Sequence, residues 1–459
     1  MKIISFIYNL FWGDLIKIPL SGGNSIGISL LVLILIPAGI LFTFRTKFLP
    51  VRMFPEMIRI TTEKNNKKEK GALSGIQSLI VSTATRVGMG NMIGVVAAIS
   101  AGGAGAVFWM WVTALLGTST AFVEGTLAQI YKTKDPVYGG YRGGPAYYLQ
   151  KLFGKGKKKS VIAVLFALSG LICWCGVSQV ISNSVSSAFN NAFNIKPIVT
   201  TVFLVFISAF IIFKKSATVK VLDIVVPLMA AFYFLLSIIV IIKNLNILPR
   251  VFVRIFEEAF GIKQVAAGGF GAALMNGVKR GLFSNEAGSG SAPCAAAAAD
   301  FDHPAKAGLF QAFGVIIDTL IICTCTSMIM LLAPKEALTG TQGMELFQTA
   351  MKHHFGNAGV IFTAITLWLF SFSTFIGILF YARSNVAFVF GDNKTSQLLY
   401  KIISLVMLFI GGLTSYTFVW QLGDIGIALM TVFNMLAIIP MSGEAIQSLN
   451  NYILLKKKK

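Results

Sequence analysis

An apolar stretch over residues 76–101 is interrupted near its centre by Gly88, Met89, Gly90 and Asn91. The stretch is long and apolar enough to cross a membrane as a helix, but two glycines and an asparagine favour a break in that helix. A break at this depth leaves backbone N–H and C=O groups without partners, which is tolerated only where protein covers them or a ligand binds them. The interruption therefore predicts a buried site for a small charged or dipolar solute.

The composition indicates a membrane protein with many spans. Of the 459 residues, 55% are hydrophobic and 12% are charged, and the mean hydropathy is +0.76. Such values are typical of polytopic membrane proteins and not of soluble enzymes. Although the net charge of +21 would suit a protein that binds nucleic acid, 23 of the 39 Lys and Arg residues lie in four segments, 45–70, 132–159, 214–220 and 456–459. Basic residues clustered between apolar spans follow the positive-inside rule, so we expect the lipid bilayer as partner and no nucleic acid.

The apolar stretches divide the chain into three parts. We expect an interfacial N-terminal helix within residues 1–25, a transmembrane domain over 26–449 and a basic cytoplasmic tail over 450–459. Eleven spans are predicted, beginning near Ile26, Ile76, Gly105, Val161, Ile198, Val221, Ala259, Ala305, Ala358, Ile402 and Gln421. With the basic loops inside, the first span runs inward and the C-terminus is cytoplasmic.

The seventh span carries a second interruption, Gly-Gly-Phe-Gly at residues 268–271. If the first span is set aside, ten remain, and the first and sixth of these carry the two breaks. Because five spans reverse the topology, the two halves would face opposite ways. Interrupted helices at matching positions of inverted halves mark the substrate site of many secondary transporters. The sequence therefore predicts an all-α fold with a 5+5 inverted repeat and one additional N-terminal span.

The first break offers groups of both polarities. The helix end before it would present carbonyls of residues such as Ala84 and Val87, and the helix start after it would present N–H groups of Met89, Gly90 and Asn91. Carbonyl ends attract cations and N–H ends attract carboxylates. One break can therefore hold a sodium ion beside the carboxylate of an amino acid. Close packing of helices through small residues is the alternative explanation for each break.

Other side chains could complete such a site. At the second break, carbonyls could receive an ammonium group, and Phe270 and Leu274 share a helix face that could close over a small side chain. Gln179 places an amide in hydrocarbon, so it either orients the solute or bonds to a neighbouring helix.

The ninth span combines hydroxyl groups with an aromatic ring. The hydroxyls of Ser373 and Thr374 and the carbonyl of Phe370 are hard oxygen ligands that suit sodium. Trp368 could form a wall of the pocket. Hydroxyls in membrane helices also bond back to their own helix, which is the alternative here.

Three acids, Glu124, Asp318 and Asp424, lie in or near apolar spans, where carboxylates are costly unless paired or functional. Asp318 could pair with Arg86. Glu124 or Asp318 could instead carry a proton, so proton coupling is an alternative to sodium coupling. A channel would need a continuous polar pore. The sequence contains no nucleophile elbow, phosphate-binding loop or zinc-protease motif, so no enzyme activity is predicted.

Six segments resemble the alanine/glycine:cation symporter family. They are 87–91 (VGMGN), 105–111 (GAVFWMW), 143–148 (GGPAYY), 275–288 (MNGVKRGLFSNEAG), 291–293 (SAP) and 318–324 (DTLIICT). The resemblance implies sodium-driven uptake of a small neutral amino acid by alternating access, on a leucine-transporter-like fold in a prokaryotic plasma membrane. Sodium would act as a coupling ion and not as a cofactor, and no protein partner is implied. The implied substrate contacts are Met89, Gly90, Asn91, Gln179, Phe270, Leu274 and Trp368, and the implied sodium ligands are Ala84, Val87, Phe370, Ser373 and Thr374.

Several positions depart from the family pattern. Met89 stands where Thr is usual, Ser289 and Cys294 stand where Met and Asn are usual, and Ile378, Leu379 and Phe380 stand where Trp, Tyr and Tyr are usual. Met89 keeps a backbone N–H for a carboxylate, but it loses a hydroxyl and adds a flexible apolar side chain. These departures leave the preferred amino acid open within the alanine and glycine class.

Overall fold

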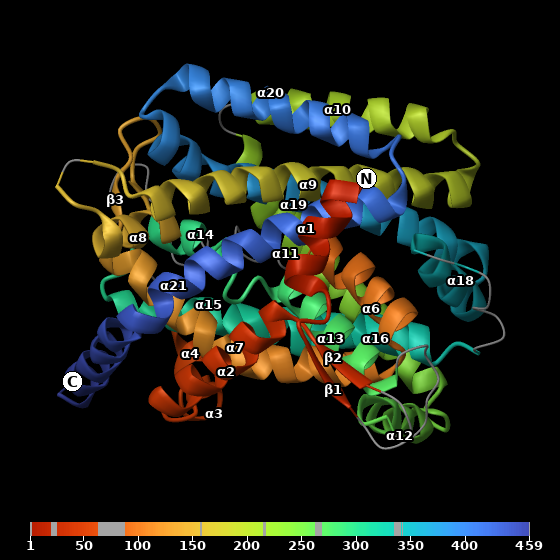
Figure 1. The fold of residues 1–459 in the computed structure, drawn as a ribbon. Helices are drawn as coiled ribbons and strands as arrows, with labels where there is room; N and C mark the ends of the chain where they lie inside the picture. The colour runs from red at the N-terminus through yellow and green to blue at the C-terminus, as the bar shows by residue number, and fades with distance from the viewer. Residues whose placement is uncertain are drawn as a thin grey trace.

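The computed structural model describes residues 2–19, 25–62, 88–156, 158–213, 217–261, 269–334, 341 and 343–458. Most of these residues are helical (Figure 1). Six described helices are long and apolar enough to cross a membrane: α7 (Gly105–Ile130), α9 (Val161–Phe193), the continuous helix made of α15 (Pro304–Val315), η2 (Ile316–Cys323) and α16 (Thr324–Leu331), α19 (Asn357–Phe390), α20 (Lys394–Gly411) and α21 (Tyr416–Lys457).

The described residues also include shorter apolar helices and one bent pair of helices. The shorter apolar helices are α2 (Leu30–Arg45), η1 with α6 (Gly90–Gly94 and Val95–Gly102) and α10 (Pro197–Phe213). Helix α11 (Ala217–Lys243) bends by 103° into α12 (Leu248–Ala259), and α13 (Gly269–Asn285) follows. Nine of the eleven predicted starts lie in a described helix, and the start near Ile26 lies in β2 (Ser25–Ile28), directly before α2. The start near Ile76 lies outside the described residues.

Short elements connect these helices. They are α3 (Leu49–Arg52), α4 (Phe54–Thr62), α8 (Pro145–Phe153), α14 (Ala292–Ala298), α18 (Met344–Phe355) and the hairpin of β3 (Thr133–Lys134) and β4 (Tyr141–Arg142), in which Thr133 pairs with Arg142.

The helices form two groups, one around α7 and one around α9. Helix α7 packs against α2, α6, α13 and α15, whereas α9 packs against α10, α19, α20 and α21. In Figure 1, α10 and α20 lie side by side at the edge of the second group. Glycines let the backbones of neighbouring helices approach each other closely in both groups. A Cβ atom at Gly426 of α21 would lie 2.4 Å from Cys173 Cα of α9, and one at Gly277 of α13 would lie 2.6 Å from Ala106 O of α7.

Both breaks predicted from the sequence lie at the ends of described helices. The structure starts η1 at Gly90, directly after Met89, and η1 is a π-helical turn. Helix α13 starts at Gly269, whose φ of 51° is a left-handed conformation that glycine adopts without strain. A second π-helical segment, η2, contacts η1. Such segments are rare and frequently lie at functional sites.

The N-terminal segment differs from the predicted interfacial helix. Helix α1 (Lys2–Trp12) ends at Trp12, and β1 (Ile16–Pro19) then pairs antiparallel with β2 (Ser25–Ile28). Trp12 is buried, and its Nε1 donates a hydrogen bond to Asp424 O at 3.0 Å. The reason for the difference is that α1 packs on α21, so one face of α1 is covered by protein.

The predicted basic C-terminal tail is helical in the described residues. Helix α21 continues to Lys457, and Tyr452 and Lys456 near its end both bond to Glu56 of α4.

Candidate functional site

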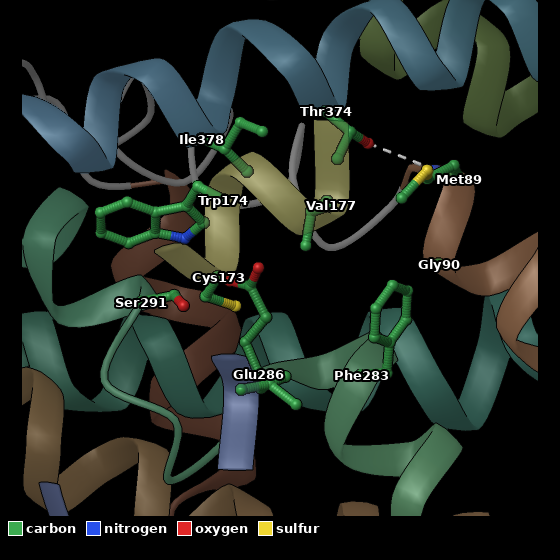
Figure 2. Close-up of a pocket in the computed structure, with 11 residues that line it drawn as sticks. Met89, Gly90, Cys173, Trp174, Val177, Phe283, Glu286, Ser291, Thr374 and Ile378 are labelled. Carbon is green, nitrogen blue, oxygen red and sulfur yellow. Dashed lines mark hydrogen bonds between the residues drawn. The ribbon is translucent and has the colours of Figure 1, made fainter. Parts of the chain in front are cut away.

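A cavity lies between the α7 group and the α9 group (Figure 2). Its volume is about 20 Å³, which is room for about one water molecule, so the cavity is nearly closed in this conformation. It is lined by Met89, Gly90, Cys173, Trp174, Val177, Phe283, Glu286, Ser291, Thr374, Ile378 and Ile427. We call it the central cavity. Five separate parts of the chain meet here, since η1, α9, α19, α21 and the segment from α13 to α14 each contribute to the lining.

The first break reaches the central cavity directly. Met89 and Gly90 line it where η1 begins. The backbone N–H of Met89 points to α19 and donates a hydrogen bond to Thr374 Oγ1 at 3.3 Å (Figure 2). The structure therefore brings together Met89, Gly90 and Thr374, three of the residues that the sequence assigned to the site.

Asn91 lies next to these residues, but its side chain faces away from the described lining of the cavity. Its Nδ2 donates hydrogen bonds to Asp318 Oδ1 at 2.6 Å and to Asp318 O at 3.0 Å. Asp318 Oδ2 accepts from Ser284 Oγ at 2.9 Å and from Thr319 Oγ1 at 2.7 Å. Asn91 thus ties η1 to η2. Arg86, the partner expected for Asp318, lies outside the described residues.

The other two predicted acids are also held by donors. Glu124 Oε1 accepts from the N–H of Gly288 at 3.2 Å, and its Oε2 accepts from Asn434 Nδ2 at 2.9 Å. Asp424 accepts two hydrogen bonds from Arg280, at 2.9 and 3.1 Å. None of Glu124, Asp318 and Asp424 is among the described residues that line the central cavity.

Four predicted substrate contacts lie elsewhere in this conformation. Gln179 Nε2 is 3.3 Å from Met407 Sδ of α20, which is the interhelical position that was the alternative for this amide. The ring of Phe270 packs edge-on against Trp109, and the ring of Trp368 stacks on Phe372. Leu274 is buried in the helix core. None of the four belongs to the described lining, so their contact with substrate stays a prediction.

The predicted sodium ligands are only partly assembled in the described residues. Ala84 and Val87 lie outside them. Ser373 Oγ donates to Phe370 O at 2.9 Å within α19, which is the intrahelical bond expected as the alternative. Thr374 is the member of this set that lines the central cavity.

Glu286 is the charged lining residue that sequence reasoning missed. It follows the end of α13 and has a φ of 56°, a left-handed conformation that is uncommon for residues other than glycine. Figure 2 shows its side chain extending into the central cavity. The available signal was an acid inside the segment 275–288, but it lies between helices and not within an apolar span.

The apolar lining residues carried no comparable signal. Cys173, Trp174 and Val177 occupy one face of α9 at helical spacing, as Thr374 and Ile378 do on α19. Both helices are apolar on every side, so the sequence does not distinguish the face that turns to a cavity.

The sequence matches the profile of the sodium:alanine symporter family over residues 19–459. The chain belongs to this family. It is 42% identical over 433 residues to the probable sodium/glutamine symporter GlnT of Bacillus subtilis, covering 93% of this chain and 88% of GlnT. It is 40% identical to the amino-acid carrier protein AlsT of the same organism, covering 98% and 94%, and 32% identical to the sodium/alanine symporter AgcS of Methanococcus maripaludis, covering 93% and 95%.

This family membership confirms the resemblance found in the sequence. The protein is a membrane transporter and not an enzyme, and sodium is the coupling ion of its family. A manganese transporter of Eremococcus coleocola has a similar fold, with a TM-score of 0.52 and 12% sequence identity over 84% of this chain and 81% of that chain. That likeness shows a shared transporter fold alone.

Two of the residues that depart from the family pattern line the central cavity. Met89 and Ile378 face it from η1 and α19, whereas Cys294 is buried on α14 beside Gly290. The two departures that reach the cavity are therefore the ones placed to affect which solute fits.

Proposed function

We propose that this transporter carries a small neutral amino acid of the alanine or glycine class in symport with sodium. The observation that supports this most is the central cavity itself. It is small, it lies where the first helix break meets α19, and its wall combines a helix start with a carboxylate.

The charge arrangement of the cavity suits a zwitterion. The start of η1 at Met89 and Gly90 carries the positive end of a helix dipole, which favours a carboxylate. Glu286 offers a negative group for an ammonium. Apolar side chains between them, such as Val177 and Ile378, would contact a small aliphatic side chain once the cavity opens.

Sodium is a transported substrate in this proposal. Thr374 Oγ1 is a hard oxygen ligand at the cavity wall, and the carbonyl of Phe370 and the hydroxyl of Ser373 lie within one turn of it on α19. A rotation of the Ser373 hydroxyl away from Phe370 O would place both side-chain oxygens at the ion. Ala84 and Val87 would add carbonyls from the other side of the first break.

Alternating access would operate through the two helix groups, as expected for a 5+5 inverted repeat. Two ion pairs join the segment after α7 to the end of α19. Arg142 bonds to Asp392, and Arg383 Nη2 lies 3.1 Å from Asp135 Oδ2. The hydrogen bond from Arg142 lowers the pKa of Asp392, which keeps that carboxylate charged. By the positive-inside rule this is the cytoplasmic side.

Glutamine is a second candidate substrate. The end of the cavity away from Met89 carries Glu286 and Ser291, which can accept from and donate to a carboxamide. The relative GlnT, at 42% identity, is named as a probable sodium/glutamine symporter.

Competition for uptake separates these candidates. The purified protein would be reconstituted in liposomes with an inward sodium gradient, and uptake of radiolabelled alanine would be measured against a panel of unlabelled amino acids. We expect alanine and glycine to compete and acidic or basic amino acids not to. Stronger competition by glutamine would select the second candidate, and no alanine uptake in wild type would contradict the first.

A further inference from the structure

A second cavity lies on the other side of Phe283 from the central cavity. It is lined by residues of α1, α6, α13 and the start of α21 and by Gly343 before α18, and its volume is about 300 Å³. Residues of α6 and the first half of α13 pack near the start of α7, whereas the Arg142–Asp392 ion pair lies beyond the end of α7. The second cavity is therefore at the opposite end of α7 from that ion pair. We call this the outer cavity.

Three buried charged side chains face the outer cavity. Asp424 accepts hydrogen bonds from Arg280 at 2.9 and 3.1 Å, and Lys279 Nζ lies 3.0 Å from Asp424 Oδ2. Lys279 and Arg280 are each 6% exposed, and Asp424 is 1% exposed. The described lining therefore holds two cations and one carboxylate. Because buried charges are costly unless paired, the surplus cation favours an anionic group in this cavity.

A buried donor in the same wall also lacks a partner. Arg280 Nε has no hydrogen-bond partner among the described residues. The Arg280 guanidinium stacks over the Trp420 ring with 3.9 Å to its centroid. Buried donors without partners are rare in proteins and call for an explanation such as a bound ligand.

The same Trp420 ring separates the outer cavity from the central one. Trp420 lines the outer cavity, Phe283 lines the central cavity, and their ring centroids are 4.8 Å apart. The Arg280 guanidinium lies 6.0 Å from the centroid of Phe283. Arg280 thus lies beside both rings that separate the two cavities, Phe283 and Trp420. It also bonds to Asp424, the only carboxylate in the described lining of the outer cavity.

We propose that the outer cavity is a second binding site for an amino-acid zwitterion, on its way to the central cavity. The carboxylate would pair with Lys279 and Arg280, and the ammonium would pair with Asp424. A bound zwitterion competes with the internal ion pair, and it thereby loosens Arg280 from the Trp420 ring that blocks the route inward. This inference rests on the proposed function, since it assumes the same class of solute.

The number of bound molecules tests the second site. Radiolabelled alanine, and glutamine in parallel, would be titrated by equilibrium dialysis against the purified full chain in nanodiscs with sodium. We expect two molecules bound per wild-type protein. The variant Lys279→Gln removes the surplus cation and should bind one, whereas Lys279→Arg should retain two.

A second variant covers the case in which Lys279→Gln fails to fold. Ser100 is exposed and lines the outer cavity, so Ser100→Trp fills the space without removing a buried charge. It should also bind one molecule, and Ser100→Ala should bind two.

The outcomes distinguish the two proposals. One molecule bound to wild type, with the same affinity in Ser100→Trp, overturns the outer site while sodium-driven uptake still supports the proposed function. No binding and no sodium-driven uptake of either amino acid overturns both.

Discussion

At the scale of single residues, Asn91 acts through Asp318. Its amide bonds to the carboxylate and the carbonyl of Asp318, and its own carbonyl accepts from Thr326 Oγ1 at 2.8 Å. The side chain is fully buried. Asn91 therefore fixes the position of η1, and with it the position of Met89 and Gly90 at the cavity.

Replacing Asn91 with alanine should weaken both stability and transport. A buried acceptor on Asp318 loses its donor, which costs about 1–3 kcal/mol of the free energy of unfolding, and η1 loses its link to η2. Thermal unfolding in detergent and sodium-driven uptake would both be measured. Asn244→Ala is the matched control, because the Asn244 side chain, directly after α11, bonds only to Val240 O among the described residues. Uptake by Asn91→Ala equal to that of the control would remove Asn91 from the site.

Met89 should influence the choice of substrate. Met89→Thr restores the hydroxyl usual in the family and shortens a side chain that lines the central cavity, so the relative uptake of alanine, glycine and glutamine should change. Competition profiles would show the change. Met92→Leu, at a buried position on η1 outside the described lining, should leave the profile as in wild type. An identical profile for Met89→Thr would show that this side chain does not select the substrate.

At the scale of helices, hydropathy predicted where several helices begin, but it did not indicate which side of a helix faces the cavity. The predicted starts near Gly105, Val161 and Ala305 match the starts of α7, α9 and α15, because long apolar segments in a membrane have few alternatives to a helix. Gln179 was assigned by its polarity within α9, but that helix has neighbours on several sides, and Met407 of α20 lies beside the amide. The sequence did not predict Glu286 as a lining residue, because its position beside α9 depends on the path of the segment that joins α13 to α14.

Helix α19 carries the proposed sodium ligands. Ser373→Ala combined with Thr374→Val removes two hydroxyl oxygens near the first break, so the sodium concentration for half-maximal uptake should rise several-fold while alanine uptake at saturating sodium persists. Thr363→Val on the same helix is the control, since Thr363 Oγ1 bonds to Gly359 O. A sodium dependence unchanged from wild type would exclude these hydroxyls as ligands.

The contact between α4 and the end of α21 should depend on pH. Burial raises the pKa of Glu56, but hydrogen bonds from Arg59, Lys456 and Tyr452 outweigh it and lower the pKa to about 2. A lowered folded-state pKa stabilises the fold above the ordinary value of 4.5, and that contribution is lost as the pH falls from 4.5 towards 2.

Thermal unfolding between pH 6 and pH 3 would measure this effect. Wild type should lose more stability over that range than Glu56→Gln, which lacks the titrating group. Glu345→Gln at an exposed position of α18 should behave like wild type. Equal pH dependence in wild type and Glu56→Gln would rule out Glu56 as a source of acid sensitivity.

At the scale of the whole molecule, the central cavity lies between two closures. The Phe283–Trp420 ring pair separates it from the outer cavity, and we propose that the ion pairs formed by Arg142 and Arg383 belong to a closure on the opposite side. The cavity is lined by η1 and the segment from α13 to α14 on one side and by α9, α19 and α21 on the other. Such an arrangement suits a transporter in which a solute is enclosed between two bodies that move relative to each other.

Coupling to sodium is the central claim, and transport under separately imposed gradients tests it most directly. Proteoliposomes containing the wild-type protein would receive an inward sodium gradient at equal pH, or an inward proton gradient without sodium. We predict that labelled alanine accumulates above its external concentration under the sodium gradient and stays at equilibrium under the proton gradient. Accumulation driven by the proton gradient alone, or equilibration without accumulation under both, would contradict sodium symport.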